Sequence, residues 1–303
     1  MNSDVNNLQA FLCFDFSQAE LRMLAEIAGD KLLIRQFQDA ASDPGNPAKD
    51  IHCQVGHTLT GWSVEKIKSE KNARKVVKNM QFGLVFGKRK ENMYDYVVSK
   101  IREIDGPDAD LTGITKKFIE DCIDKYFEKY RGVAQYMRNT VAQAEHQGFV
   151  ETLFGFRREI FQEDETRETF WGNQAINAPI QGSAHGLLLI ALALLHLKPK
   201  TYNLLQVPVM EIHDALDFFV KVRDLPKAYL QGKHLLEVGV VEYVARHFKR
   251  QLQVPLVAEA TTGFCLGSCV DYAGETADIW LPTWRKKHRD VEEKSWKALE
   301  QIV

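Results

Sequence analysis

Two short apolar segments, each followed or ended by an aspartate, lie near opposite ends of this 303-residue chain. Residues 8–16 (LQAFLCFDF) predict a mostly buried strand with Asp15 near its end. Residues 206–212 and 215–222 predict an antiparallel hairpin whose turn holds Asp214. Most of the sequence between the two segments is typical of helices. One sheet must therefore join distant strands, which predicts an α+β fold with a helical insertion.

The remaining predicted elements set the domain limits. We expect four parts: residues 1–29 with the first strand, a helical insertion over 30–160, the hairpin part over 161–270 and a charged tail over 271–303. Long helices are predicted over 64–87, 89–100, 115–146, 167–197 (broken or kinked at Pro179) and 226–249, and a further strand over 254–262.

Composition excludes some classes of protein and leaves others open. The chain has 39 basic and 41 acidic residues, so its net charge of −2 gives no sign of a polyanionic partner. Its five cysteines form no Cys-x-x-Cys pair, which favours free thiols in a reducing compartment. The N-terminus lacks the features of a signal peptide, and the apolar run 187–197 is shorter than a membrane span. We expect a cytoplasmic protein without membrane contact.

Asp15 and Asp214 are the first candidates for chemistry. An unpaired carboxylate in an apolar strand costs several kcal/mol unless something compensates it. An arginine partner or a turn cap is the simpler explanation for either residue alone. At the ends of neighbouring strands, however, the two carboxylates can together hold the divalent metals that assist phosphoryl transfer.

The predicted helix around residues 71–84 has one apolar face and one basic face. Phe82 lies on the basic side, among cations that include Arg74 and Lys78. A solvated lysine face is the common explanation for such charges, but it does not explain the ring. Arg74 and Lys78 are spaced to clamp a triphosphate while Phe82 stacks beside a base or sugar, and Gly83 and Gly87 allow close approach of a nucleotide. We favour a nucleotide platform.

Six segments resemble the sequence motifs of family A DNA polymerases, in the order found in that family, between about residue 8 and about residue 270. DFSQAELR (15–22), RKVVKNMQFGLVFG (74–87) and EIHDALDF (211–218) resemble motifs A, B and C, and DIH (50–52), GFVETLFGFRR (148–158) and NAPIQGSA (177–184) resemble three further blocks. The resemblance implies a right-hand polymerase palm, an antiparallel sheet, in parts 1–29 and 161–270. The inserted part 30–160 would be the helical fingers.

The resemblance also implies a reaction and its partners: template-directed addition of dNTP to a primer 3′-hydroxyl on primer–template DNA, with two Mg²⁺. Asp15 and Asp214 would be the catalytic metal ligands. Arg74 and Lys78 would hold the triphosphate, Lys78 also acting as the acid for the leaving pyrophosphate. Phe82 would lie against the incoming sugar.

Secondary roles follow from the same resemblance. Glu20 would exclude a ribose 2′-hydroxyl and contact Phe86, where the family usually has tyrosine. His52 would lie near the triphosphate. The minor groove of the primer–template would be contacted by Asn177, Gln181 and His213.

The sequence departs from the family pattern at motif C. Ala215 replaces a glutamate, and Asp217 lies two positions further on, on the same face of a strand but one pleat away. A non-catalytic DNA-binding or accessory relative with a decayed site is therefore a second hypothesis. A two-metal nuclease is a third, although it has no need of the Arg74–Lys78–Phe82 helix.

Two expectations concern the ends of the sequence. The first motif begins about a dozen residues after Met1, so the resemblance covers palm and fingers only. We expect a second polypeptide to supply the thumb and exonuclease-type domains, as in a polymerase split by interruption of a phage-like gene; a truncated relic is the alternative. The tail tryptophans, Trp280, Trp284 and Trp296, indicate either a docking surface or packing of the tail onto its own body.

Overall fold

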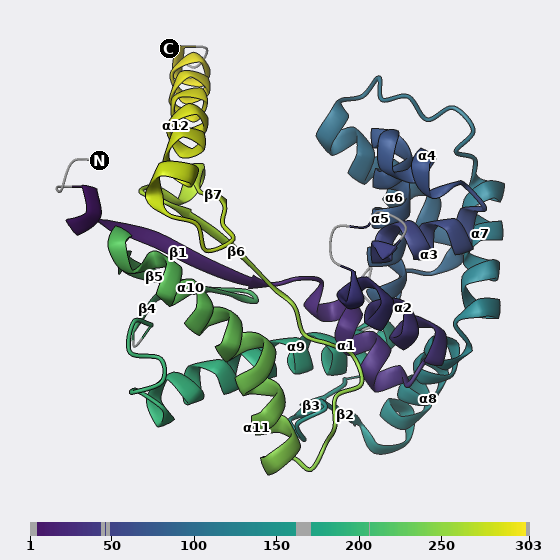
Figure 1. Ribbon diagram of the computed structural model, residues 1–303. Coiled ribbons are helices and arrows are strands. Elements are labelled where there is room, and N and C mark those ends of the chain that lie inside the picture. Colours follow the sequence, from purple (N-terminus) through teal and green to yellow (C-terminus); the bar gives the residue numbers. More distant parts are fainter. Residues whose placement is uncertain (1–4, 44–45, 47–48, 162–170, 206, 301–303) are drawn as a thin grey trace. The chain divides into compact units, whose positions relative to one another are not determined.

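The computed structural model describes residues 5–43, 46, 49–161, 171–205 and 207–300, with side chains as far as Val291 (Figure 1). Its contacts divide the chain into two compact units. The sheet unit comprises the residues up to Ala19, His185–Leu252 and those from Leu256 on. The helical unit comprises Glu20–Ala184 and Gln253–Pro255. The predicted α+β architecture is confirmed.

The sheet unit is built on five antiparallel strands in the order β4-β5-β1-β6-β7. Their bounds are Gln9–Phe16 (β1), Pro208–Ile212 (β4), Ala215–Lys221 (β5), Ala258–Gly263 (β6) and Val270–Asp271 (β7). The central strand β1 pairs Asp15 with Ala215 on one side and with Glu259 on the other. Strands from both ends of the chain therefore form one sheet, as the sequence predicts.

The two faces of this sheet differ in chemistry because successive side chains of a strand alternate between faces. One face carries Leu12, Phe14 and Phe218, all nearly inaccessible to solvent. Helix α10 (Leu225–His234) covers that face, with the Tyr229 ring stacked on Phe14 at 6.3 Å between centroids. Burial of each such aromatic side chain contributes about 1.5–3 kcal/mol. The opposite face carries the polar side chains, including Asp15.

The helical unit contains nine described helices, α1 and α9 each crossing into the sheet unit. Their bounds are Ala19–Ala28 (α1), Lys31–Ser42 (α2), Ile51–Thr60 (α3), Val64–Ser69 (α4), Lys71–Val85 (α5), Lys90–Asp105 (α6), Lys116–Lys129 (α7), Arg131–Gln147 (α8) and Trp171–Leu197 (α9). A hairpin of β2 (Phe149–Glu151) and β3 (Arg157–Glu159) precedes α9.

Two helices predicted as continuous are interrupted. Glu70 has extended backbone angles and separates α4 from α5. Tyr130 separates α7 from α8, because its ring is fully buried and its hydroxyl donates a hydrogen bond to Gln36 Oε1 at 2.9 Å. Periodicity alone does not reveal such breaks, since the apolar pattern continues across them.

The unit boundaries also differ from the predicted domain limits. They fall after Ala19 and after Ala184, within α1 and α9, whereas the sequence placed limits at residues 29/30 and 160/161. Long helices that continue from one unit into the next carry no turn signal at the boundary. Residues 162–170, which the prediction assigned to the palm, lie outside the described residues.

Helix α9 is, by length and composition, apolar enough to cross a bilayer, although the prediction considered only its run 187–197. In the structure 56% of its most apolar window is buried inside the protein. Pro179 lies within the helix. Burial of this kind is typical of a core helix.

Helix α10 continues through a π-helical turn, Leu235–Gly239, into α11 (Val240–His247). The chain then returns to the sheet through β6.

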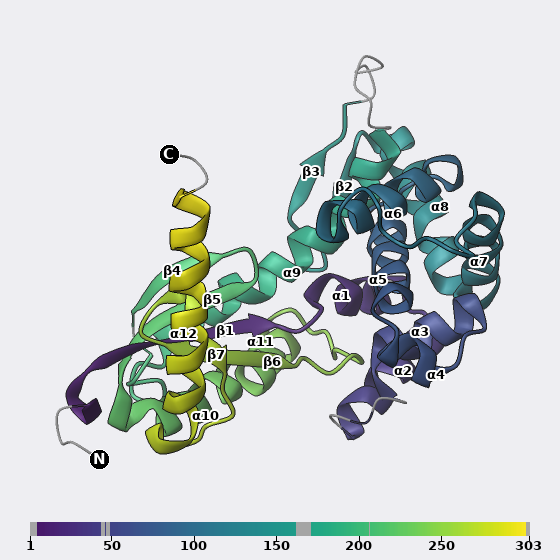
Figure 2. The same cartoon turned by 90° about the horizontal axis from the view of Figure 1, so that it is seen from above.

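The tail after Asp271 is a helix rather than an unpacked extension. The last helix of the chain, α12 (Ala277–Glu300), packs beside β7 (Figures 1 and 2). Trp280 is 3% exposed and Trp284 packs on Phe264, whereas the Trp296 side chain lies outside the described residues.

The close packing of α10 on β1 predicts a stability effect. Gly232 faces the Phe14 ring so closely that an added Cβ atom would overlap it. We expect Gly232→Ala to lower the free energy of unfolding by about 1–3 kcal/mol in urea denaturation, because the core must shift to accept the methyl group.

Gly267→Ala is the matched control, since no atom lies within 4 Å of its added Cβ. Its free energy of unfolding should change by less than about 0.5 kcal/mol. Equal stability of the two variants would show that α10 does not pack on Phe14 in this way.

Candidate active site

The sheet unit brings together the two aspartates that the sequence singled out. Asp15 is the next-to-last residue of β1, and Asp214 lies in the turn between β4 and β5. The backbone N–H of Phe16 donates to the carbonyl oxygen of Asp214 at 3.4 Å. The Asp214 side chain lies close enough to Asp15 to contribute to the raised pKa of that carboxyl group. Antiparallel pairing of β1 with β5 is what places them side by side.

The contact between the two carboxylates has an electrostatic cost. Partial desolvation raises the pKa of Asp15 to about 7, and the negative charges of Asp214, Glu259 and Asp217 act in the same direction. Without a cation, Asp15 therefore tends to hold a proton near neutral pH. A divalent cation between the two carboxylates would relieve the repulsion.

The residues present fit a Mg²⁺ site in which the protein supplies only a few of the ligands. Among the described residues, no group of three or more His, Cys, Asp or Glu side chains is placed to hold a metal ion. Mg²⁺ is usually held by only one or two carboxylates, with water and substrate phosphates as its other ligands. Asp15 and Asp214 provide such a pair.

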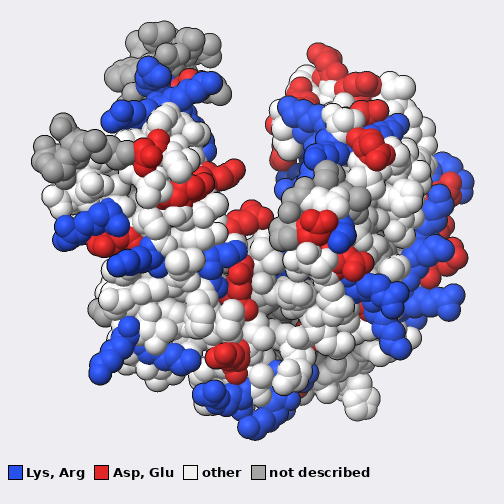
Figure 3. Space-filling model, viewed as in Figure 1, with Lys and Arg blue, Asp and Glu red and all other residues white. Residues whose placement is uncertain are grey.

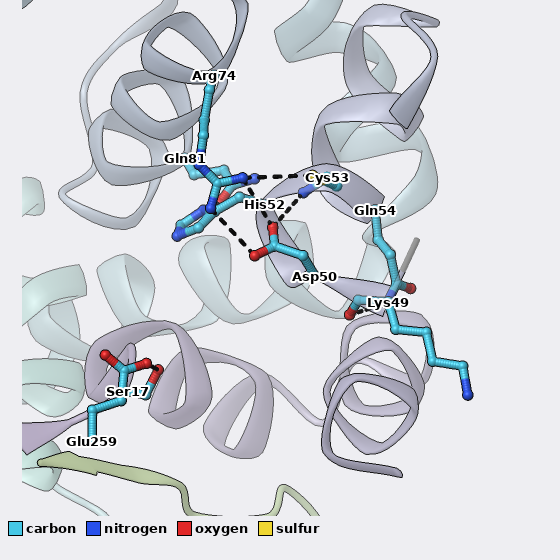
Figure 4. A network of polar contacts seen from close by, with 9 residues as sticks. All are labelled: Ser17, Lys49, Asp50, His52, Cys53, Gln54, Arg74, Gln81 and Glu259. Atoms are coloured by element: carbon cyan, nitrogen blue, oxygen red, sulfur yellow. Dashed lines mark hydrogen bonds and ion pairs between the residues drawn. The ribbon is translucent and has the colours of Figure 1, made fainter. Parts of the chain in front are cut away.

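Glu259 is a third acidic residue of this site, and the sequence reasoning missed it. It lies directly opposite Asp15 on β6, so its side chain is on the same face of the sheet. The Ser17 hydroxyl donates a hydrogen bond to Glu259 Oε1 at 2.9 Å (Figure 4). The strand 254–262 was predicted, but its register against β1 was not, and only the register shows that Glu259 neighbours Asp15.

Asp217 does not take the place of the missing motif C glutamate. Its side chain is 4% exposed and lies opposite Cys13, one row along the sheet from Asp15. Hydrogen bonding to Cys269, burial and contact with Asp217 raise the pKa of the Cys13 thiol, which therefore stays protonated. Ala215 occupies the position beside Asp15 itself.

The predicted basic face of α5 is divided among several partners. Arg74 pairs with Asp50, at 3.4 Å from Nη1 to Oδ1 and 3.3 Å from Nη2 to Oδ2 (Figure 4). Asp50 also caps α3 by accepting from the backbone N–H of Cys53 at 3.0 Å. Desolvation by burial opposes the charge of each partner, but the mutual hydrogen bonds prevail, lowering the pKa of Asp50 and raising that of Arg74. Asp50 thereby fixes where the guanidinium lies.

The other cations of α5 differ from Arg74. Lys71 and Lys75 pair with Asp105 of α6. Lys78 is exposed, and within the described part of the chain no acidic side chain pairs with it. Its Nζ lies 5.7 Å from the centre of the Phe82 ring. Lys78 is thus the cation of this face that pairs with no described acidic side chain, and the Phe82 ring lies beside it.

His52 is a buried, neutral neighbour of these cations. Its side chain is 5% exposed, and Nδ1 lies 2.6 Å from Gln81 Oε1 (Figure 4). Burial lowers the pKa of His52, and the positive charges of Arg74 and Lys78 contribute further. His52 therefore lies in the neighbourhood of Arg74 without a charge of its own, and its place near the triphosphate stays a prediction.

A cavity of about 320 Å³ lies in the helical unit beside the end of α5. Asn177 Nδ2 donates to the carbonyl oxygen of Phe86 at 3.2 Å and so joins α9 to α5. The Phe86 ring is stacked on Phe82, 6.2 Å between centroids. The cavity combines one aromatic ring, several amides and two cations; its lining residues are Phe86, Lys88, Arg158, Asn173, Gln174, Asn177, Ala178 and Gln181.

The two glycines of motif B have different functions. Gly83 is buried against Met93 of α6, and an added Cβ would press on that sulfur, so the expectation that Gly83 faces a nucleotide is wrong. Gly87 adopts a φ of +66° where α5 ends. Its absent side chain also makes room for Asn173 at the cavity.

The remaining predicted residues lie in their expected elements. Glu20 is in the first turn of α1, half-buried within the helical unit. His213 is exposed in the turn beside Asp214, with a left-handed backbone φ of 56°. Phe86 has no hydroxyl to donate to a carboxylate, so any contact between Glu20 and Phe86 is made by the ring.

Comparison with known proteins agrees with this arrangement. Residues 4–267 match the sequence model of DNA polymerase family A. The chain belongs to this family. Its relatives include DNA polymerase I of Lactococcus lactis subsp. lactis (31% identical over 256 residues, 83% of this chain and 25% of the relative) and of Caldicellulosiruptor bescii (32% over 254 residues, 82% and 26%).

This family A chain thus spans about a quarter of the length of those relatives. Its fold resembles the POL domain of Pol1 from M. smegmatis, solved in complex with DNA primer–template and dNTP. The TM-score is 0.65 at 22% sequence identity, covering 86% of this chain and 40% of the other. The likeness supports the palm-like sheet with its helical subdomain.

The Asp15–Asp214 contact predicts how stability depends on pH in the absence of metal. The pKa of Asp15 is about 7 in the folded chain against an ordinary value of 3.8, so between these pH values the folded chain binds more protons than the unfolded chain. Stability should therefore fall as pH rises from about 4 to about 7. We expect Asp15→Asn to flatten this decline in urea unfolding with EDTA.

Added Mg²⁺ should restore wild-type stability at pH 8 and leave Asp15→Asn almost unchanged. An identical pH dependence of the two proteins in EDTA would contradict the contact between the carboxylates.

Proposed function

We propose that this chain carries the polymerase site of a DNA-directed DNA polymerase, which joins dNTP to the 3′-hydroxyl of a primer paired with a template. The observation that carries the proposal is the placement of Asp15 beside Asp214 by the pairing of β1 with β5 and the backbone hydrogen bond from Phe16 to Asp214. Both motif aspartates are present and adjacent. In addition, helix α5 of the helical unit has a face with cations and the aromatic ring of Phe82.

Asp15 and Asp214 would hold two Mg²⁺, which when bound neutralise charge on the phosphates and on the attacking and leaving oxygens. The two side chains fix the ions at the edge of the sheet. Glu259 adds negative charge on the same face and holds Ser17, the residue that links β1 to α1. We assign Glu259 a positioning role.

Lys78 is the residue that we propose as proton donor. Its Nζ is solvent-accessible and unpaired within the described part of the chain, so the triphosphate does not have to displace a carboxylate to reach it. The ammonium group can bind phosphate oxygens and transfer a proton to the leaving pyrophosphate. The Phe82 ring, one turn further on, offers a surface for the sugar.

Arg74 would bind the triphosphate while still attached to Asp50. A guanidinium group has five N–H donors, and Asp50 and Cys53 occupy only the side that faces α3. The remaining donors can bind a phosphate oxygen. Buried His52, paired with Gln81, supports this arrangement through packing rather than through charge.

The cavity beside Phe86 would accept part of the DNA. A flat aromatic ring stacks with nucleobases, and amide side chains can bond to their edges. Asn177 and Gln181 line this cavity and are the residues that we propose for contact with the primer–template. His213, in the turn beside Asp214, would contact the primer end. The solved relative with bound primer–template and dNTP supports DNA and nucleotide as ligands.

The other two hypotheses are less well supported. A decayed relative would have no reason to keep the Asp15–Asp214 contact. A two-metal nuclease would need the aspartates but not an accessible Lys78 above an aromatic ring. Incorporation of dNTP into a primer separates the polymerase from both.

A second polypeptide with a thumb remains part of the proposal. Among the described strands, β4 pairs only with β5, so its other edge is open. Val209 and Ile212 of this strand are 41% and 48% exposed. Native proteins usually cover an open apolar edge. A cytoplasmic location, in a host cell if the gene is viral, stays a prediction.

The metal assignment predicts the effect of two isosteric substitutions. We expect Asp15→Asn and Asp214→Asn each to reduce single-turnover dNTP incorporation at least about 10³-fold, because each removes a metal ligand while keeping the shape of the side chain. Binding of the primer–template, measured by fluorescence anisotropy, should stay within about threefold.

Asp217→Asn is the matched control on the same sheet face. Its buried amide oxygen can still accept from Cys13, so incorporation should remain within about tenfold of wild type. Substantial extension by either metal-ligand variant, with circular dichroism showing a native fold, would refute the metal assignment.

The Phe82 platform predicts a change in substrate choice. We expect Phe82→Tyr to admit dideoxynucleotides at least about tenfold more readily relative to dNTP, because its hydroxyl can replace the missing 3′-hydroxyl as a hydrogen-bonding group. Competition between a terminator and its dNTP in primer extension measures the ratio. Phe86→Tyr adds the same hydroxyl one turn later and should leave the ratio unchanged; an unchanged ratio in Phe82→Tyr would remove Phe82 from the sugar site.

A further inference from the structure

Helix α12 contains the longest run of basic residues in the chain, Arg285-Lys286-Lys287-His288-Arg289. The run lies beyond residues 4–267, which match the family. The function of this helix therefore has to be inferred from its own contacts and charges.

Two tryptophans hold α12 on the sheet unit. The Trp280 and Trp284 rings lie 5.8 Å and 5.0 Å from the Phe264 ring, centroid to centroid. An added Cβ on Gly263 would lie only 2.7 Å from Trp284, so the glycine makes room for the indole. The helix is therefore a packed part of the sheet unit, and its charges have a defined place.

Two of the five basic residues are used in this packing. Lys287 Nζ donates to the carbonyl oxygen of Cys269. The His288 ring is stacked on Trp284 at 4.8 Å, and its Nδ1 lies 3.1 Å from the Ser268 hydroxyl oxygen. Both residues thus help to fasten α12.

The other three basic residues, Arg285, Lys286 and Arg289, are exposed, and no acidic side chain in the part of the chain with described side chains forms an ion pair with them. Many surface lysines elsewhere do have such a partner, as Lys90 has in Asp124 and Lys117 in Asp121. Positions i, i+1 and i+4 lie on one side of a helix. Figure 3 shows this gathering of basic atoms on α12, below the grey atoms near the C-terminus.

The basic residues belong to a helix that packs on the sheet face of Asp15. Gly263 is paired with Phe11, and directly opposite residues point to the same face. Phe11, Cys13 and Asp15 alternate along β1 and share that face. Trp284 thus packs four residues along β1 from Asp15, a distance of about 13 Å at ~3.3 Å per residue.

We propose that Arg285, Lys286 and Arg289 bind the phosphate backbone of duplex DNA upstream of the primer end. The inference rests on the proposed function, which brings the primer terminus to Asp15. In this proposal the duplex runs along β1 away from Asp15, so a separation of about 13 Å corresponds to about four base pairs at ~3.4 Å per step. The three side chains would therefore reach phosphates from roughly the fourth base pair onward. Such contacts add affinity without sequence preference, through release of condensed counterions.

The test compares two triple variants of the full chain. Arg285→Gln/Lys286→Gln/Arg289→Gln removes the three charges of α12. Lys200→Gln/Lys227→Gln/Arg246→Gln is the control: it removes three exposed charges in the turn after α9, on α10 and on α11. Primer–template affinity is measured over a range of NaCl concentrations. We expect the α12 variant to lower the slope of log K against log[salt] by up to about three, and the control by less than about one.

A second DNA locates the contact. Neutral methylphosphonate linkages replace the phosphates from the fourth to the eighth base pair upstream of the primer end. On this duplex the difference in affinity between wild type and the α12 variant should disappear. A difference of unchanged size would overturn the proposed position.

The outcomes separate this inference from the proposed function. A wild-type chain that binds and extends the primer, with an equal salt slope in the α12 variant, overturns the inference alone and leaves the basic face for another partner, such as an acidic protein. A wild-type chain that neither binds nor extends DNA, alone or together with a thumb-bearing partner, overturns the proposed function, and the inference with it. Circular dichroism verifies that both variants retain their helices.

Discussion

The repulsion between Asp15 and Asp214 is the constraint on which the site depends. Antiparallel pairing of β1 with β5 forces the two carboxylates together, and Glu259 on β6 adds a third negative charge to the same face. Burial, first, and this concentration of charge both raise the pKa of Asp15, so the ionised carboxylate costs free energy in the folded chain. A bound cation would offset this unfavourable free energy, so the polar face of the sheet is suited to a cation. The apolar opposite face packs on α10 and supplies the stability that holds the strands in place.

In the helical unit the concentrated charges are positive: α5 carries four neighbouring cations, and acidic side chains pair with three of them. Asp50 fixes Arg74 while capping α3, and Asp105 pairs with Lys71 and Lys75. Lys78 and the Phe82 ring remain accessible. Gly83 lets α6 pack closely behind α5, so this face is rigidly supported. Of these four cations, Lys78 is the one that no described acidic side chain pairs with.

The sequence predicted the elements and motif residues better than their surroundings. Apolar runs revealed β1 and the β4–β5 hairpin, and motif spacing identified Asp15, Asp214, Arg74, Lys78 and Phe82. Register and long-range pairing were not accessible, since Glu259 beside Asp15, Cys13 opposite Asp217 and Asp50 on Arg74 each join distant segments. The breaks at Glu70 and Tyr130 were missed because tertiary contacts, such as that of Tyr130 with Gln36, override a continuous helical pattern.

Direct metal binding tests the assignment of Asp15 and Asp214 most closely. Mn²⁺ can replace Mg²⁺ as a paramagnetic probe, and its binding to the chain with primer–template and a non-hydrolysable dNTP analogue can be followed by electron paramagnetic resonance. We expect Mg²⁺ to displace it, Asp15→Asn and Asp214→Asn each to weaken its binding at least about tenfold, and Asp217→Asn to bind it as wild type does. Equal Mn²⁺ affinity in wild type and both ligand variants would contradict a metal site at the end of β1.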